Sequence, residues 1–329
     1  MRAFFVVAII LLAGVFLSFS ASAATTHACT LTKPILINYG TVSSVVVNTT
    51  PQSQTFNIQI SCPIVLAIAA PGSIIIAYTS ATTASNSRAI LTSSTTDTIP
   101  VQLTCTSQTC TTATEMKVAD SKSIPSSTFL GLLANKQYSL PFTLSTVPQS
   151  VAAGSYATSI TLTVTWNICT AGILVLCSDN DTGSDTLVIP ISLNVTNDCA
   201  TITAPDINFG SAPVAGSFST QSGIITLVCT KGATYTVGIN DGQNSSGGIR
   251  NMSATINTTK YLLGYDIYQS TTNNRWGSVG SQRWGSASAT TTSTDTMTKT
   301  YNYTAKIFPN QNTPPAGTYN DTLVVDVAF

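Results

Sequence analysis

The stretch GTYNDTLVVDVAF, residues 317–329, decides the fold of this chain. It has a near copy in GSYATSITLTVTW, residues 154–166, and both stretches read as a turn followed by a strand of alternating side chains. After the first copy the chain continues into DTLVIPISLNVTN, residues 185–197, where apolar residues alternate along one face of a second strand. After the second copy nothing follows Phe329. We therefore expect the first half to carry its own final strand and the second half to be one strand short.

Composition and the first residues point to an exported protein. Residues 1–23 read as a signal peptide, with Arg2, an apolar run and the small-residue site Ala21-Ser22-Ala23. No later stretch is long and apolar enough to span a bilayer, so we expect the mature chain to be soluble. Without Arg2, twelve Lys and Arg stand against thirteen Asp and Glu, which gives no electrostatic reason to bind nucleic acid or anionic lipid.

An internal duplication organises the cysteines. The first half opens CTLTKPILINYG at Cys29 and reaches Cys62, and the second opens CATITAPDINFG at Cys199 and reaches Cys229. Eight cysteines in an exported chain indicate disulfides. Sequence alone does not fix their connectivity, but the repeat makes one set the most economical: Cys29–Cys62 and Cys199–Cys229, with Cys105–Cys110 and Cys169–Cys177 as local clamps. No CxxC pair or nearby histidine supports a metal site, and we expect none.

Runs of Ile, Val, Thr and Tyr between Gly, Pro, Asn and Ser predict many short strands, and no segment shows a period of 3.6. The fold class expected is all-β, with two tandem immunoglobulin-like antiparallel β-sandwiches, the C-terminal one lacking its final strand. The domains expected are a signal peptide at 1–23, a self-complete domain at 24–196 and a second domain at 197–329. The expected strands of the first half lie at about 31–38, 54–62, 73–79, 88–92, 99–105, 113–118, 138–145, 156–167 and 186–196.

The second half carries four motifs in order: RNM at Arg250, YLLGYDIYQS at Tyr261, RWGS at Arg275 and PAGTYNDTLVVDVAF at Pro315. Together they resemble the spore coat protein U domain, the fold of pilin subunits in archaic chaperone–usher pili of the Csu type. The resemblance runs from Cys199 to the end. The first half shares only the opening cysteine pair and the G-[ST]-Y strand.

The resemblance implies donor-strand complementation. Such pilin domains are sandwiches that lack one strand, and a periplasmic chaperone, then the neighbouring subunit, lends a strand to fill the groove. An open sheet edge beside a bare core must be covered. The alternative is a complete sandwich whose last strand happens to be terminal. The residues expected on the edge of the groove are Leu323, Val325, Val327 and Phe329.

A shaft subunit of such a fibre also donates a strand, from an extension of about ten or more residues. Only ATTHA, residues 24–28, stands between the expected cleavage site and Cys29. We therefore expect a subunit that accepts a strand without donating one and stands at the pilus tip, which resembles the two-domain tip adhesins of the Csu pilus. The partners implied are a periplasmic chaperone, an outer-membrane usher and an adjacent pilin subunit, with export through the periplasm to the cell surface.

Strand parity places three apolar loops at the far end of the first domain, at residues 63–72, 119–137 and 168–185. Exposed apolar clusters of this kind mark interaction sites, so we expect attachment to abiotic or host surfaces and biofilm formation. The alternative is that these side chains turn back into the core, above all in 63–72. The surface-binding residues predicted are Val65, Leu66, Phe129, Leu130, Leu132, Leu133, Ile173, Leu174, Val175 and Leu176.

Other signals favour structural roles. Trp276 and Trp284 could stack on a sugar, but packing over a sheet is favoured. The D-x-D-x-G-x-D run from Asp179 to Asp185 resembles a calcium loop but lacks the bidentate Glu, so a polar turn is favoured.

An enzyme is not expected, because the single histidine, His27, lies near the mature N-terminus and the familiar catalytic patterns are absent. No cofactor is expected either. The alternative functions are a carbohydrate-binding tip lectin and a structural spore-coat-like surface protein or minor pilin.

Overall fold

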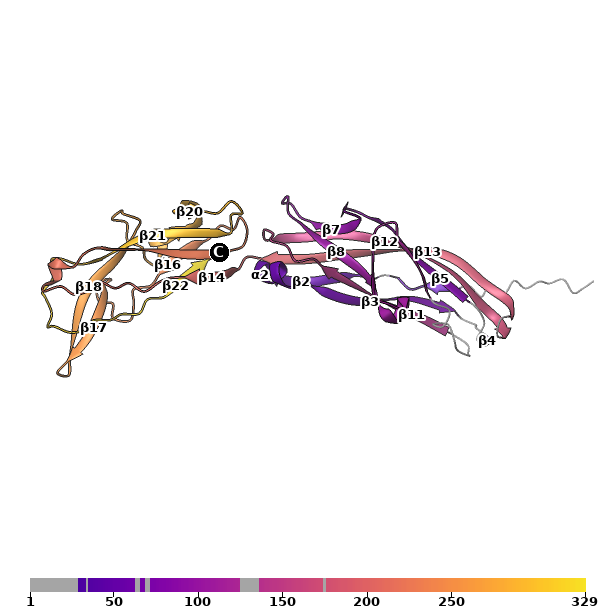
Figure 1. The fold of residues 1–329 in the computed structure, drawn as a ribbon, viewed down its shortest axis with the longest axis horizontal. Helices are drawn as coiled ribbons and strands as arrows, with labels where there is room; N and C mark the ends of the chain where they lie inside the picture. Colours follow the sequence, from indigo (N-terminus) through magenta and orange to yellow (C-terminus); the bar gives the residue numbers. More distant parts are fainter. Residues whose placement is uncertain (1–28, 34, 63–65, 69–71, 125–135, 174–175) are drawn as a thin grey trace, which may run out of the picture.

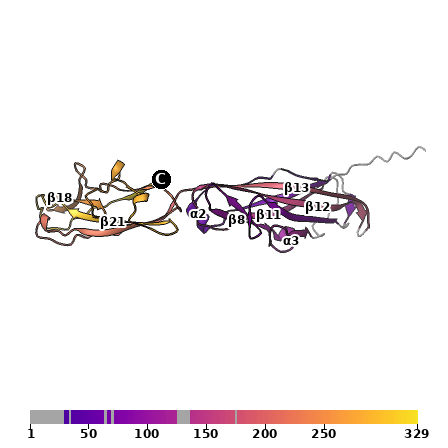
Figure 2. The same cartoon turned by 90° about the horizontal axis from the view of Figure 1, so that it is seen from above.

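The computed structural model describes residues 29–33, 35–62, 66–68, 72–124, 136–173 and 176–329, and the predicted signal peptide lies outside these residues. Their strands form two separate systems that lie end to end in an elongated molecule (Figures 1 and 2). The change from one system to the other falls between Thr196 and Cys199. No helix within the described ranges is long and apolar enough to cross a membrane.

The first system is a two-layered sandwich. One layer has the strand order β1-β3-β11-β8-β7, and the other has β10-β5-β12-β13-β2. The layers meet where Ala157 pairs with Thr92. The elements are β1 (Thr30–Leu31), β2 (Ile37–Ser43), α2 (Ser44–Thr49), β3 (Ser53–Cys62), β4 (Leu66–Ile68), β5 (Gly72–Ala81), β6 (Ala84–Ser85), β7 (Arg88–Thr92), β8 (Thr98–Cys105), α3 (Ser107–Cys110), β9 (Thr114–Met116), β10 (Ser121–Ile124), β11 (Lys136–Thr146), β12 (Gly154–Ile173) and β13 (Leu176–Thr196).

Strand β13 closes the core of this sandwich. It pairs antiparallel with β12 on one side and parallel with β2 on the other. Its alternate residues Leu187, Ile189 and Ile191 are buried, as the period of two along the sequence predicts. The first half therefore fills its own sandwich with its own last strand.

Two features of the first half differ from the prediction. Residues 168–185 were expected to form a loop, but β12 runs to Ile173 and β13 begins at Leu176. The hairpin persists because Trp166 covers Gly183 on the paired strand, where a Cβ would lie 2.3 Å from the indole ring. The prediction of a loop here was wrong. The side chains of these strand ends are mostly polar and exposed, so the sequence shows no alternating apolar residues that would indicate a strand.

The second difference is the helix α2, which is too short to show a helical period in the sequence. Ser43 caps it by accepting a hydrogen bond from the Val46 N–H at 3.3 Å, and Val47 is buried beneath it. A local cap and one buried contact therefore produce a helix that periodicity cannot reveal.

The second system repeats the plan with fewer strands. One layer has the order β14-β15-β21-β18-β17, and the other has β19-β16-β22. The elements are β14 (Cys199–Thr203), η2 (Ala215–Ser217), β15 (Gln221–Cys229), β16 (Thr236–Ile239), β17 (Arg250–Ile256), β18 (Thr259–Gln269), η3 (Gly280–Gln282), β19 (Trp284–Gly285), η4 (Ser286–Ser288), β20 (Thr291–Thr292), β21 (Thr298–Ile307) and β22 (Val325–Ala328).

Four disulfides join the cysteine pairs expected from the repeat. Two link neighbouring strands or their ends within one layer, Cys29 with Cys62 beside β1 and β3 and Cys199 with Cys229 between β14 and β15. Two close local loops: Cys105 with Cys110 and Cys169 with Cys177.

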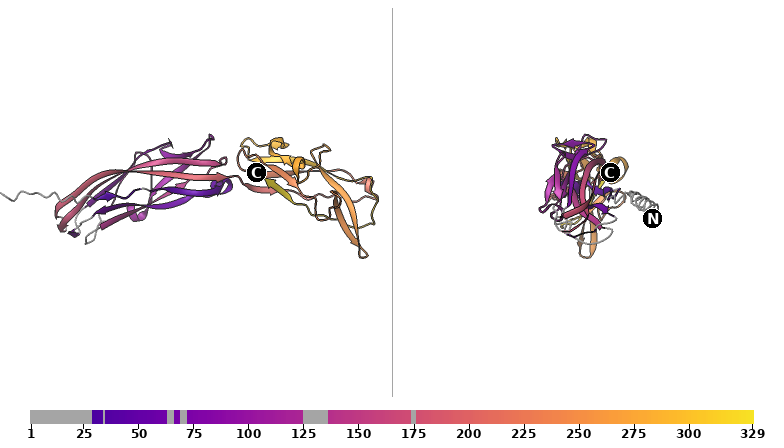
Figure 3. Two further views of the ribbon diagram at one scale, coloured as in Figure 1. Left: turned by 180° about the vertical axis from the view of Figure 1, so that it is seen from behind. Right: turned by 90° about the vertical axis from the view of Figure 1, so that its right-hand side faces the viewer.

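The two halves touch through a small polar junction. Ser44 of α2 shares a 2.5 Å hydrogen bond with Thr230, which also donates to the linker carbonyl of Asp198 at 3.0 Å. Lys231 forms an ion pair with Asp97 across the same junction. Seen from behind and along the long axis, the two halves lie in line (Figure 3).

Candidate functional sites: an open groove and an apolar hairpin tip

A cavity of about 460 Å³ opens into the core of the second half. One wall is the segment 204–209, which forms no strand, and the other is the segment 319–325 that leads into β22. Between them lie core side chains of both layers. These floor residues are Ile225, Ile239, Met252, Tyr265, Ile267 and Tyr303.

Strand β22 leaves this groove open along one side. It pairs antiparallel with β16, and within the described part of the chain it has no second neighbour. Its counterpart β12 has β5 on one side and β13 on the other. The second half thus has an unpaired sheet edge at the place where the first half has a strand.

Two matching pairs of hydrogen bonds support this comparison of the halves. Tyr156 donates its hydroxyl to the carbonyl of Ala152 at 2.8 Å, and Tyr319 donates to that of Pro315 at the same distance. Such a bond fixes the start of a strand in immunoglobulin-like sandwiches. The opposite walls agree too, because Asn38 accepts from the Gly40 N–H and Asn208 from the Gly210 N–H.

Burial shows the effect of the absent neighbour. In the first half the core side of β12 and β2 is buried, whereas the equivalent side chains of the second half are only half-buried. The buried residues are Ile37, Tyr156, Ile160, Leu162 and Val164, and their half-buried counterparts are Ile207, Tyr319, Leu323, Val325 and Val327.

The predicted edge residues occupy different places. Leu323 and Val325 line the cavity. Val327 lies on the same face of the strand but is not among the lining residues. Phe329 is 56 % exposed and packs edge-on against Tyr235, with the ring centres 5.8 Å apart.

Sequence reasoning missed the other wall of the groove, residues 204–209. The signal was present in the duplication, because KPILINYG at Lys33 aligns with TAPDINFG at Thr203. In the first half β2 begins within this stretch, at Ile37, and pairs with β13. In the second half residues 204–209 form no strand.

One end of the groove is polar. The carboxylate of Asp321 accepts hydrogen bonds from the Gln243 N–H at 2.9 Å, the Asn244 amide at 3.2 Å and the Tyr265 hydroxyl at 2.8 Å. Burial and the Asp321 carboxylate raise the pKa of Tyr265, so its hydroxyl stays protonated and donates.

A buried ionic cluster supports the groove floor from behind. Arg250 of the RNM motif is fully buried and pairs with Asp266 at 2.5 Å, which in turn pairs with Arg275 at 2.6 Å. Burial lowers the pKa of Arg250, and the Asp266 carboxylate opposes that shift. Arg250 also donates to the carbonyls of Ile239, Asn240 and Trp276, so it ties the end of β16 to β17 and to the RWGS segment.

Both tryptophans of the repeated RWGS segments are buried in the core. Trp276 packs edge-on against Trp284, with ring centres 4.9 Å apart, and its indole donates to the Val237 carbonyl. Side chains placed in this way are not available to stack on a sugar.

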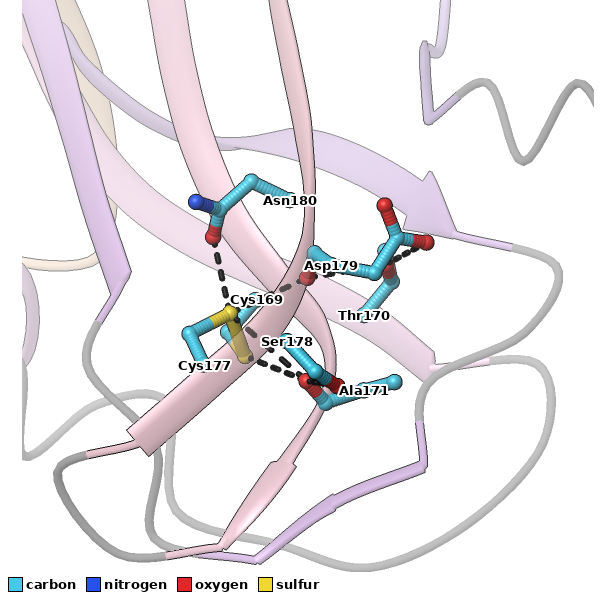
Figure 4. The surroundings of a disulfide bond; sticks show 7 residues. All are labelled: Cys169, Thr170, Ala171, Cys177, Ser178, Asp179 and Asn180. Carbon is cyan, nitrogen blue, oxygen red and sulfur yellow. Dashed lines mark hydrogen bonds between the residues drawn. A yellow bond between two sulfur atoms is a disulfide. The ribbon is translucent and has the colours of Figure 1, made fainter.

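The tip of the β12–β13 hairpin is the second candidate site. Behind the Cys169–Cys177 disulfide, Ser178 donates to the Ala171 carbonyl at 2.9 Å, and Thr170 donates to the Asp179 carboxylate at 3.0 Å (Figure 4). These contacts hold the two strands together close to their turn.

Apolar side chains stand exposed at this tip. Ile173 is 62 % exposed and Leu176 is 76 % exposed. β4 pairs in parallel with β12 there, so that Leu66 lies opposite Ala171 in the ladder. Two of the three predicted loops therefore reach the same end. The other predicted residues lie outside the described residues: Val65, Phe129, Leu130, Leu132, Leu133, Leu174 and Val175.

The acidic run of β13 has structural partners. Asp181 accepts from the Cys29 N–H at 2.6 Å and from the Trp166 indole at 3.3 Å, and Asp185 pairs with Lys33. The run lies along a strand rather than in the expected turn. Among the described residues, no group of three His, Cys, Asp or Glu is placed to hold a metal ion.

A comparison with protein families identifies the second half. Residues 185–326 match the model of the Spore Coat Protein U domain. This part of the chain is similar to the spore coat protein U domain and is called the spore coat U domain below. The match begins inside β13, ahead of the opening Cys199 that marked the resemblance in the sequence. The curated proteins contain no match.

Solved structures of pilus subunits are similar to this chain in fold. The chaperone–tip adhesion subunit pre-assembly complex CsuC–CsuE, from archaic chaperone-usher Csu pili of Acinetobacter baumannii, is similar with a TM-score of 0.59 and 24% identity. The similarity covers 92% of this chain and 100% of that one. The CupB6 tip adhesin of Pseudomonas aeruginosa (TM-score 0.37, 10% identity) covers 91% of this chain and 93% of its own.

The shared fold confirms the prediction of two all-β sandwiches, with the spore coat U domain as the second. The matched Spore Coat Protein U domain and the similar chaperone–tip adhesion subunit complex are not enzymes, in agreement with the prediction that this chain is not one.

Proposed function

We propose that this protein is a tip adhesin of a chaperone–usher pilus, held by a strand that another subunit lends to its spore coat U domain. The observation that supports this most strongly is the contrast between the two halves. The first half fills its groove with β13, and the second half exposes the equivalent groove beside β22. A sheet edge beside a half-buried core favours a strand supplied in trans.

A lent strand would bury apolar side chains in alternation. Covering about five of them contributes roughly 8–15 kcal/mol gross, an upper bound that excludes the ordering of the strand. In this proposal a periplasmic chaperone fills the groove first, and the adjacent pilin replaces it at the outer-membrane usher. The similar CsuE was crystallised with its chaperone CsuC, in agreement with such a first step.

The domain division follows the same plan. Residues 24–196 form a self-complete adhesive domain, and residues 197–329 form the anchoring domain. The hairpin tip of β12–β13 lies at the end of the molecule away from the spore coat U domain (Figure 1). After export through the periplasm, the protein would stand at the pilus tip with Ile173 and Leu176 facing outward. Apolar side chains there suit attachment to abiotic or host surfaces, and hence biofilm formation.

The attachment test replaces both exposed tip residues, as Ile173→Asp with Leu176→Asp. Each apolar side chain that is buried on a surface contributes about 1.5–3 kcal/mol, so we expect attachment of piliated cells to polystyrene to fall at least tenfold. The matched control is Val188→Asp, because Val188 is 54 % exposed on the same hairpin but away from its tip. Pilus number on the cells is counted in parallel.

If cells with normal pili and both tip substitutions attached as well as the parent strain, the apolar tip would be excluded as the adhesive surface. If Val188→Asp reduced attachment equally, the hairpin would act through a property other than its tip.

A further inference from the structure

The filled groove of the first half gives the register of the empty one. Where the two layers of the first half meet, Ala157 pairs with Thr92. In the second half, Asn320 pairs in the same way with Ser253. In the other direction, Leu162 pairs with Tyr78 of β5, and Val325 pairs with Ile239 of β16. Both pairings agree with the alignment of residues 154–166 with residues 317–329, in which Ala157 corresponds to Asn320 and Leu162 to Val325.

With this register, each residue of β13 specifies a position for a lent strand. Leu187 lies opposite Leu162, Ile189 opposite Ile160 and Ile191 opposite Thr158. The equivalents of these partners in the second half are Val325, Leu323 and Asp321. Two of the three partners remain aliphatic, but the third is a carboxylate where the first half has a threonine.

No cation is bonded to Asp321 among the described residues. Its three hydrogen-bond donors, from Gln243, Asn244 and Tyr265, are all neutral. Asp321 takes part in none of the ion pairs of the described residues. Lys260 donates to Asn244, one of these donors, rather than to Asp321. The residues that line the cavity include Asp206 and Asp321 but no Lys or Arg.

A strand that covers the groove also covers this carboxylate. Thr158, the equivalent in the first half, is buried against Ile191 with a hydroxyl partner in Thr83. An aliphatic side chain placed over Asp321 would remove water from an unpaired charge, which is unfavourable. A carboxylate offers about four acceptor sites, and three are used, so one remains for the incoming strand.

We infer that the donor strand of this groove carries a Lys or Arg at the position facing Asp321, between aliphatic residues that face Leu323 and Tyr319. The inference rests on the proposed strand acceptance and adds the chemistry by which the groove selects its donor. Directly opposed side chains on neighbouring strands lie about 4.5–5.5 Å apart at Cβ, within reach of a hydrogen-bonded ion pair.

The test uses peptides with the sequence of residues 185–196 and the mature chain, residues 24–329. One peptide is unchanged, one carries Ile191→Lys, and one carries Ser192→Lys, which has the same charge on the outward face. Dissociation constants are measured by fluorescence anisotropy. We expect the Ile191→Lys peptide to bind about tenfold more tightly than the other two, the equivalent of one cation–carboxylate hydrogen bond.

The protein variants Asp321→Asn and Asp321→Thr then remove the charge. Asp321→Thr restores the residue type of the first half, and either variant is used once circular dichroism shows a native fold. We expect the advantage of the Ile191→Lys peptide to shrink to within about twofold on both.

The outcomes separate the two proposals. Strand acceptance itself would be wrong if none of the peptides bound. It would also be wrong if chemical labelling of Leu323 and Val325 were the same with bound peptide as without it. If the peptides bound in the groove but the unchanged sequence or Ser192→Lys matched Ile191→Lys, the groove would accept strands without selecting a cation. A lysine preference that survived Asp321→Asn and Asp321→Thr would overturn the role of Asp321.

Discussion

Replacing Arg250 with alanine is expected to destabilise the spore coat U domain by about 3–5 kcal/mol, because it breaks a buried ion pair from one side. The guanidinium joins Asp266 to three main-chain carbonyls, those of Ile239, Asn240 and Trp276. After the substitution these acceptors are buried without their donor, and Arg275 is the one ion-pair partner left to Asp266 among the described residues. Chemical denaturation of residues 24–329, followed by the fluorescence of Trp276 and Trp284 in the second half and of Trp166 in the first, measures the effect.

Arg88→Ala is the matched control in the first half. Arg88 pairs with Glu115 at 2.5 Å, but both side chains are partly exposed, and such pairs contribute about 0–1 kcal/mol. The two variants therefore compare a fully buried arginine with a partly exposed one in the same chain. An Arg250→Ala protein as stable as the Arg88→Ala protein would show that the buried cluster contributes little to the fold.

The duplication explains why much of the fold is predictable from the sequence. The alternation of residues such as Leu187 and Ile189 reports burial directly, and the repeated cysteine spacing identifies the disulfide partners found in the structure. The long hairpin of β12 and β13 was not predicted beyond Asn167. There the two strands are held by the Trp166 ring over Gly183 and by the hydrogen bond from the Trp166 indole to Asp181. Contacts of this kind between paired strands leave no periodic apolar pattern in the sequence.

One wall of the groove was predictable from the sequence, and the other was not. Leu323 and Val325 belong to a segment whose alternation is visible in the sequence, so one wall was identified. The opposite wall, residues 204–209, forms no strand in the structure and gives no strand signal. Its role appears only when β2 is seen beside β13 in the first half. The polar end at Asp321 depends on loops at Gln243 and Asn244, whose position over the strand no local pattern encodes.

Substitutions at the groove edge, where inward and outward side chains alternate, are expected to have the other large effect, a loss of strand capture. Leu323→Asp and Val325→Asp each place a carboxylate on the face that lines the cavity, whereas Val324→Asp places the same charge on the outward face. Each inward substitution removes about 1.5–3 kcal/mol of apolar burial and adds the cost of covering an unpaired charge. We therefore expect capture of a donor strand to weaken at least about 100-fold for the inward pair of variants.

Val324→Asp is a stringent control because Val324 lies between the two test residues and is 56 % exposed. All three variants change the net charge equally, so a general electrostatic effect would act on all of them. Co-purification with the periplasmic chaperone and incorporation into pili measure strand capture in two separate steps. If the inward variants co-purified and assembled like Val324→Asp, a strand would not enter this groove, and the open edge of β22 would need another explanation. Loss of both steps in the inward variants alone would instead show that the contrast between the two halves is functional, because the face that β13 covers in the first half would then be the face that a partner covers in the second.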